Sequence, residues 1–147
     1  MDDLVRWLGE QLDEDERIAR AATWHDDAGA WTAHQSEYDS PRRSERRWFI
    51  MDSMDDGVIT DVDPEASQPG GVARHVAEHD PARVLREIDA KRQLLNLHAP
   101  GETEYVDGDV CMACDVRGGA PFYPCKTLRL LALPYADRPG YREDWRP

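Results

Sequence analysis

The three cysteines of this chain lie close together in its last third, and they constrain its fold more than any other feature. They are preceded by a histidine, which gives the spacing H-x12-C-x2-C-x10-C. Three thiolates and one imidazole form a ligand set that suits a tetrahedral zinc ion. We therefore predict a structural zinc site that holds the C-terminal half of the chain together, with the ligands His98, Cys111, Cys114 and Cys125.

The sequence constrains the fourth ligand less than it constrains the cysteines. His98 is the nearest histidine in sequence and falls at the end of an expected helix, and His79 is the alternative. Three unrelated thiols beside a helix-capping histidine would give the same pattern. An iron–sulfur cluster is disfavoured because it usually takes a fourth cysteine. An odd cysteine count with a CxxC pair also argues against disulfides and for a reducing compartment, the cytoplasm.

Composition excludes several classes of protein. A chain of 147 residues is about one domain long. Eighteen basic and thirty acidic residues give a net charge of −12, which repels phosphate, so direct binding of nucleic acid is not expected. Neither a membrane-length apolar run nor a signal peptide pattern is present, so we expect no membrane partner and no secretion. The acidity serves solubility, or it forms a surface for a basic protein partner, for example as a DNA mimic that inhibits a DNA-binding protein.

The spacing of apolar residues predicts an α+β fold. Residues 2–22 form an N-terminal amphipathic helix that Asp2 or Asp3 can cap. Three short β-like runs follow at residues 30–38, 46–52 and 57–61, and they suggest a small antiparallel meander packed on the first helix. Residues 64–71 are interpreted as a loop or hinge because they are rich in Pro, Ser and Gly.

The C-terminal half is expected to be helical. The clearest helix spans residues 81–97, because Asp80 can cap it and Pro81 takes the first helical position. Shorter helices are predicted at 72–78 and 126–133, with a polar loop after Gly101. We interpret residues 1–147 as a single domain. Residues 1–63 hold the helix and the meander, and residues 72–147 form the zinc-stabilised helical half.

A second pattern suggests an enzyme. His75, Glu78 and His79 match the H-x-x-E-H motif of inverted zinc peptidases. The two histidines fall one turn apart on one helix face, and Glu78 could act as the base. Pro81 cuts this helix short and no third ligand can be assigned, so ordinary surface histidines are the preferred explanation. No P-loop, G-x-S-x-G or dinucleotide-binding motif is present, and we assign no catalytic residue.

The chain also resembles a known group of sequences. The similarity lies in the run HVAEHDPARVLREIDAKRQLLNLH, in the later CMAC and in the ending CKTLRLLALPYADRPGYREDWRP. These segments are similar to small uncharacterised actinobacterial and actinophage proteins that are grouped as a domain of unknown function. The resemblance covers essentially the whole chain and is strongest from His75 to Pro147. It implies a bacterial cytosol or phage origin and draws attention to His75, His79, His98 and the cysteines, but it implies no activity.

Two classes of function remain. The first is a non-enzymatic, zinc-stabilised interaction or regulatory module whose helices and aromatic tail dock onto a protein partner. The second is a zinc-dependent hydrolase that uses His75, Glu78 and His79, or an open position at the cysteine cluster. A closed sphere of four ligands favours the module, and a metal-bound water in a pocket favours the enzyme. The oligomeric state is left open.

Overall fold

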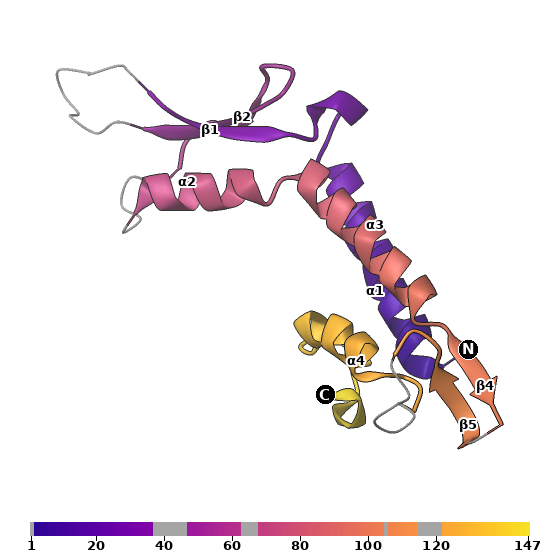
Figure 1. The fold of residues 1–147 in the computed structure, drawn as a ribbon. Helices are drawn as coiled ribbons and strands as arrows, with labels where there is room; N and C mark the ends of the chain where they lie inside the picture. Colours follow the sequence, from indigo (N-terminus) through magenta and orange to yellow (C-terminus); the bar gives the residue numbers. More distant parts are fainter. Residues whose placement is uncertain (1, 37–46, 63–67, 105, 115–121) are drawn as a thin grey trace. The chain divides into compact units, whose positions relative to one another are not determined.

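The computed structural model describes residues 2–36, 47–62, 68–104, 106–114 and 122–147. Its helices are α1 (Asp3–Ala21), α2 (Pro69–Glu78), α3 (Pro81–Leu97) and α4 (Lys126–Ala132). Its strands are β1 (Trp31–Gln35), β2 (Trp48–Asp52), β3 (Gly57–Ile59), β4 (Pro100–Thr103) and β5 (Val106–Cys111) (Figure 1). Three 3-10 turns add η1 (Asp26–Ala28), η3 (Leu133–Tyr135) and η4 (Glu143–Trp145). The expected α+β class, with an N-terminal helix and antiparallel strands, is confirmed. Over the described ranges, no helix has the length and apolar character needed to cross a membrane.

Contacts divide the chain into two compact units, which are described separately. Unit 1 comprises Met1–Asp15 and Glu87–Pro147, and unit 2 comprises Glu16–Arg86. Helices α1 and α3 are each divided between the two units, α1 after Asp15 and α3 after Arg86. The organisation as a single domain stays a prediction.

Unit 2 is built on an antiparallel sheet of order β1-β2-β3. Trp31 at the start of β1 pairs with Asp52 at the end of β2. The pairing of β2 with β3 shifts between Ile50 and Met51, and this irregularity precedes the turn that joins the two strands. The predicted meander is therefore present, although positions 37–38 and 46 of its expected strands lie outside the described residues.

Helix α2 lies along β1 and β2 (Figure 1), whereas the sequence suggested that the N-terminal helix packs on the meander. Its buried residues are the small Ala73 and Ala77, which permit a close approach. A Cβ atom on Gly70 would come within 2.8 Å of ring carbons of Trp48, so this position requires glycine. Gly70 belongs to the first turn of a helix that begins at Pro69, and not to the loop expected at residues 64–71; residues 64–67 of that loop lie outside the described residues.

Asp80 joins the start of α3 to β1 within unit 2. Its Oδ1 accepts the backbone N–H of Arg83 at 2.7 Å, which is the expected helix cap. Its Oδ2 accepts the backbone N–H of Trp31 at 3.0 Å. One carboxylate thus satisfies a donor of the helix and a donor of the strand.

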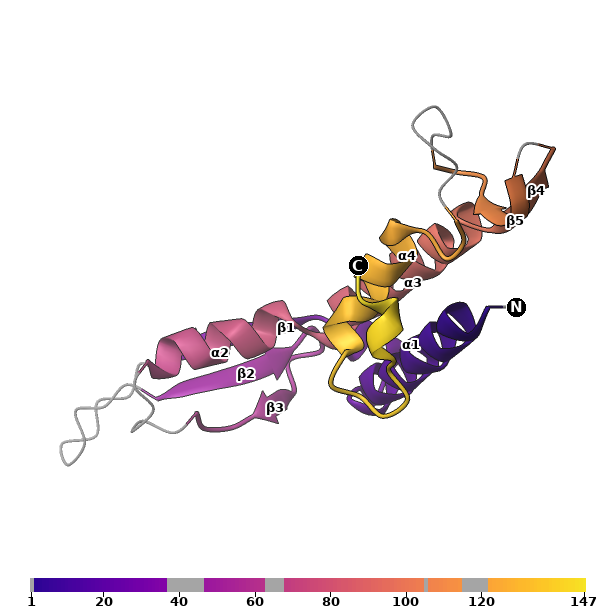
Figure 2. The same ribbon diagram turned by 90° about the horizontal axis from the view of Figure 1, so that it is seen from below.

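Unit 1 has its core along the first turns of α1. Leu4, Leu8 and Leu12 recur at helical spacing and are 0%, 1% and 0% exposed. Burying each leucine contributes about 1.5–3 kcal/mol as an upper estimate. Leu128 and Ala132 of α4 are buried in the same unit, where α4 and the turns after it lie beside α1 (Figure 2).

Trp7 connects α1 to the last residues of the chain. Its indole Nε1–H donates to the carbonyl oxygen of Pro139 at 3.0 Å. Its ring packs against Tyr141 and Trp145, with centroids 5.6 Å and 5.4 Å away. Gly140 has a φ of 87°, and a Cβ atom there would lie 2.9 Å from the Trp7 Nε1, so both backbone and space require glycine.

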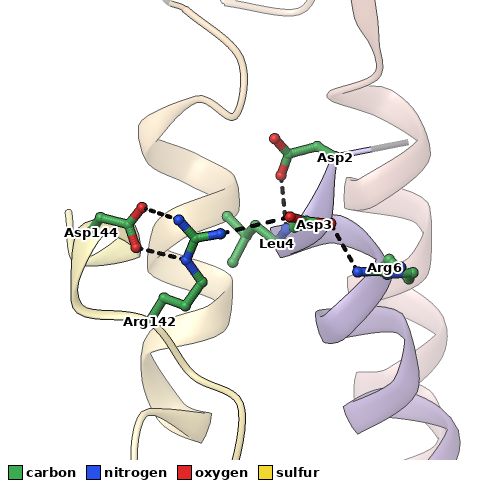
Figure 3. A network of polar contacts seen from close by, with 6 residues as sticks. All are labelled: Asp2, Asp3, Leu4, Arg6, Arg142 and Asp144. Carbon is green, nitrogen blue, oxygen red and sulfur yellow. Dashed lines mark hydrogen bonds and ion pairs between the residues drawn. The ribbon is translucent and has the colours of Figure 1, made fainter.

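Charged side chains add a second link at the same place (Figure 3). Asp2 caps α1 by accepting a backbone N–H of the first turn at 2.9 Å. Asp3 pairs with Arg6 at 2.8 Å and with Arg142 at 3.6 Å, and Arg142 also holds Asp144 at 2.7 Å. Because these side chains are mostly exposed, each ion pair contributes about 1 kcal/mol or less.

Candidate metal centre

The position of His98 is set by helix α3. The helix ends at Leu97, and the backbone N–H of His98 still donates to the carbonyl oxygen of Leu94 at 3.0 Å. The last helical hydrogen bond therefore fixes the backbone of the histidine.

A hairpin of β4 and β5 brings the first two cysteines to this helix end (Figure 1). Pro100, the first residue of β4, pairs with Cys111, the last residue of β5. His98 stands two residues before Pro100 and so comes next to Cys111. The sequence predicts a polar loop here, because the charged Asp107 and Asp109 obscure a period of two. Their alternation with Gly108 and Val110 is the signal that could have indicated a strand.

A turn and a helix start supply the remaining ligands. After Cys111 the chain turns so that the backbone N–H of Cys114 donates to the carbonyl oxygen of Cys111 at 3.4 Å. Cys125 is the residue before α4. The segment that leads to it is held by β5, since the N–H of Tyr123 donates to the carbonyl oxygen of Asp109 at 3.0 Å.

The four side chains converge on one point. The Nδ1 atom of His98 lies 3.3 Å from the Sγ of Cys111, 3.7 Å from that of Cys114 and 3.5 Å from that of Cys125. All four ligand atoms lie within 4.8 Å of one another. Zn–S and Zn–N bonds of about 2.3 and 2.0–2.1 Å at tetrahedral angles place nitrogen and sulfur about 3.6 Å apart. The three nitrogen–sulfur separations thus match edges of a coordination tetrahedron, and the residues fit a zinc-sized ion.

The environment of the thiols differs from one to the next. Cys111 and Cys125 are buried, and Cys114 is partly exposed. Burial, together with hydrogen bonds to the other two thiols and their negative charge, raises the pKa of Cys114 to about 12. Burial also opposes ionisation of Cys125, but the N–H of Leu128, the two thiols and the N–H of Thr127 outweigh it and lower its pKa. The site thus favours one thiolate, and a second or third thiolate would be repelled by the first. A divalent cation bound between the sulfurs would offset this repulsion.

The whole chain, residues 1–147, matches the model of a family that is described as a family of unknown function, DUF6221. The chain belongs to the DUF6221 family. No curated protein and no solved structure matches it. The resemblance to a domain of unknown function is thereby confirmed, and the description of DUF6221 carries no activity.

The two other histidines of interest in this DUF6221 protein lie in unit 2, His75 on α2 and His79 directly after its last residue. His75 and His79 are exposed, and their ring centroids are 4.4 Å apart. The Nδ1 of His79 lies 2.8 Å from the carbonyl oxygen of His75. Among the residues that the structure describes, the His98 cluster is the only group of three or more His, Cys, Asp or Glu placed to hold a metal ion. The histidine that joins the cysteines is therefore His98, and the H-x-x-E-H pair has no third ligand in that part of the chain.

Proposed function

We propose that this DUF6221 protein is a zinc-stabilised, non-enzymatic interaction module of actinobacterial or phage origin that works in the bacterial cytoplasm. The observation that carries the proposal is the convergence of four ligand atoms within 4.8 Å. Three thiolates and one imidazole complete a tetrahedral zinc sphere and leave no position for a reactive water. Soft thiolates with one imidazole also favour zinc over the oxygen-seeking Mg²⁺ and Ca²⁺.

The proposed ion would tie together three elements of unit 1. His98 follows α3, Cys111 and Cys114 belong to the hairpin and its turn, and Cys125 precedes α4. Zinc binding contributes on the order of 10–16 kcal/mol in small zinc domains, which is as large as the stability of a typical domain. Removal of the ion should therefore unfold the hairpin and α4.

Metal analysis of the purified chain tests the proposal, and we expect one zinc per chain. Cobalt(II) in its place should give the intense visible absorption of a tetrahedral thiolate site. Cys114→Ser and Ala113→Ser form a matched pair of variants. Each places a serine in the same turn, at the partly exposed position 114 or at the exposed position 113. Only Cys114→Ser should lose the metal and lower the melting temperature. Absence of metal, with a melting temperature unaffected by chelators and by Cys114→Ser, would refute the zinc site.

A groove in unit 1 is the proposed docking face for a partner. It has a volume of about 620 Å³ and lies between α1 and the end of α3. Its apolar wall includes Val5, Leu95, Ala99 and Pro100. From Asp2 to Asp13 the α1 side of this groove is about 16 Å long at 1.5 Å per residue, which accommodates about three turns of a helix.

Gly9 is the residue that points to a helix as the occupant. It lies inside α1, where glycine costs about 0.5–1 kcal/mol relative to alanine. A Cβ atom there would meet nothing within 4 Å, so packing within the chain does not require glycine. Gly9 lines the groove, and its missing side chain leaves room for the close approach of another backbone.

Charge decides which helix would fit. Arg6 is paired with Asp3 and Arg92 with Asp13, so these two basic residues of the groove are neutralised. Glu10 keeps an unpaired carboxylate within the described residues. The chain as a whole carries a charge of −12, which repels a second copy and attracts a basic segment. The proposed partner therefore presents a basic amphipathic helix.

A synthetic amphipathic helix of lysine and leucine serves as the probe for this groove. Gly9→Leu should fill the groove and weaken peptide binding at least about tenfold, which corresponds to about 1.4 kcal/mol. Ala90→Leu adds the same side chain at an exposed position of α3 outside the groove and should leave binding unchanged. Equal effects of the two variants would refute the groove. If the protein alone forms a dimer, and only Gly9→Leu dissociates it, then the occupant of the groove is a second copy of the chain and not a different protein.

The other proposals from the sequence make contrasting predictions. A DNA mimic would bind a DNA-binding protein with strong salt dependence and would be insensitive to Gly9→Leu. A hydrolase at His75 and His79 would need a zinc that survives Cys114→Ser and an activity that Glu78→Gln abolishes. Direct binding to nucleic acid is not expected at a net charge of −12.

A further inference from the structure

A second cavity, of about 410 Å³, lies entirely within unit 2. It is formed where the end of α1 and the start of β1 meet the turn between β2 and β3. Two indole rings and two carboxylates line it, those of Trp24, Trp31, Asp52 and Asp56. None of these residues belongs to the metal cluster.

Trp24 is exposed and yet held in a fixed orientation. Its side chain is 63% exposed, so it contributes little to the core. Its Nε1–H donates to Oδ2 of Asp52 at 2.9 Å. Fixing an exposed side chain costs conformational entropy, and the folded chain recovers little of it through burial. A ligand that packs against the indole face would recover it.

Asp52 is a buried carboxylate that no basic side chain of the described residues neutralises. It is 5% exposed and takes part in none of the ion pairs found within those residues. Burial would raise its pKa, but the N–H of Asp56, the indole of Trp24 and the N–H of Met54 outweigh this and lower the pKa. The carboxylate is therefore ionised at neutral pH, and a buried negative charge that no basic side chain neutralises attracts a cation.

Asp56 adds a second carboxylate to the same wall. Its side chain is exposed and makes no hydrogen bond or ion pair within the described residues. Both oxygens of Asp52 already accept N–H donors, at 2.9 to 3.0 Å. A cation with many N–H donors, or a metal ion that needs several free oxygens, would therefore find free acceptors on Asp56 alone. A quaternary ammonium group needs no acceptor and binds well against tryptophan faces.

We propose that this cavity binds an organic cation of the methylated ammonium class. Its charge faces the carboxylates of Asp52 and Asp56, and its methyl groups contact the rings of Trp24 and Trp31. The site is independent of the zinc cluster and of the groove in unit 1.

Choline is the probe, and 3,3-dimethyl-1-butanol is its uncharged isostere of the same shape. Titration of the full chain, at constant ionic strength, is followed by the indole N–H signals in two-dimensional NMR. Choline should shift the Trp24 signal, which is identified by its loss in Trp24→Phe, with a dissociation constant in the millimolar range. The isostere should bind at least about fivefold more weakly, since it has no cation–π attraction. Equal binding of the two compounds, or no shift with choline, would overturn the proposal.

Two neighbouring aspartates provide the control for charge. Asp56→Asn and Asp55→Asn remove the same charge from exposed positions, but only Asp56 lines the cavity. Asp55 has a φ of 64°, which asparagine adopts readily, so its replacement leaves the turn intact. Asp56→Asn should weaken choline binding about fivefold, and Asp55→Asn less than about twofold. Equal weakening would mean that the general field of the acidic chain attracts choline, and it would overturn the cavity as the site.

Discussion

Unit 1 contains one tyrosine whose hydroxyl group is hydrogen-bonded and one whose buried hydroxyl group is not. The hydroxyl of Tyr135 donates to Oδ2 of Asp15 at 2.9 Å and accepts from Nζ of Lys91 at 3.2 Å. The hydroxyl of Tyr141 is buried and has no partner within the described part of the chain. Tyr135→Phe and Tyr141→Phe each remove one oxygen and keep the ring, so the two variants isolate the hydroxyl.

The magnitudes follow from the partners that each change leaves behind. Hydrogen bonds to charged groups contribute about 1.5–3 kcal/mol each. After Tyr135→Phe, Asp15 keeps its ion pair with Arg138 at 2.6 Å, and the partly exposed Lys91 regains water, so we expect a total loss of about 2 kcal/mol. Tyr141→Phe removes a buried hydroxyl without a hydrogen bond, which costs about 1–3 kcal/mol to bury, so it should be neutral or stabilising by about 1 kcal/mol.

Differential scanning calorimetry of the metal-loaded protein measures both effects. A change of 1 kcal/mol moves the melting temperature of a chain of this size by about 2–4 °C. Tyr135→Phe should therefore lower it by about 4–8 °C, while Tyr141→Phe should leave it unchanged or raise it by up to about 4 °C. If Tyr141→Phe lowered the melting temperature as much as Tyr135→Phe, the assignment of one bonded and one unbonded hydroxyl would be refuted.

The unfolded form of Asp52 takes up a proton near pH 3.9 and the folded form only at lower pH, so its stabilising contribution is lost as the pH falls through this range. Asp52→Asn should lack this component in an acid titration followed by circular dichroism. Burial and the neighbouring Asp15 raise the pKa of Tyr135, so its contribution is complete below the pKa of an unfolded tyrosine, about 10, and is lost above it. The wild type should therefore have a higher free energy of unfolding than Tyr135→Phe below about pH 10, and the two values should converge as the pH is raised further. Arg142→Ala breaks two exposed ion pairs and a cation–π contact with Trp145, and it should lower the free energy of unfolding in urea by about 2 kcal/mol or less. A larger loss would contradict the exposed geometry.

Local signals explain what could be predicted from the sequence. The bounds of α3 are those expected, because Asp80 and Pro81 mark its start and the apolar period continues to Leu97. The grouping of the cysteines could be proposed because CxxC is a short-range pattern. The sequence favours His98 over His79 only because His98 lies nearer to the cysteines in the chain, whereas its position beside them depends on the hairpin that brings Pro100 opposite Cys111.

Long-range contacts explain what the sequence did not reveal. The position of α2 on the sheet depends on the close approach of Gly70 to Trp48, which no period in the sequence encodes. The hydrogen bond from Trp24 to Asp52 joins residues 28 positions apart, and it makes an apparently ordinary loop tryptophan part of a cavity wall. Residues of this kind are recognised only once the strands are paired.

The contact between Trp7 and Pro139 joins residues 132 positions apart, so it cannot form until nearly the whole chain has been synthesised. A ribosome that adds about 5–20 residues per second completes that span in roughly ten seconds. During this interval the apolar face of α1, formed by its three buried leucines, has been synthesised, but the C-terminal residues that bury it have not. The nascent chain therefore exposes an apolar surface that chaperones can bind. Transcripts cut short before Lys126 would lack α4 and leave that apolar surface uncovered, and their products should be cleared by proteases.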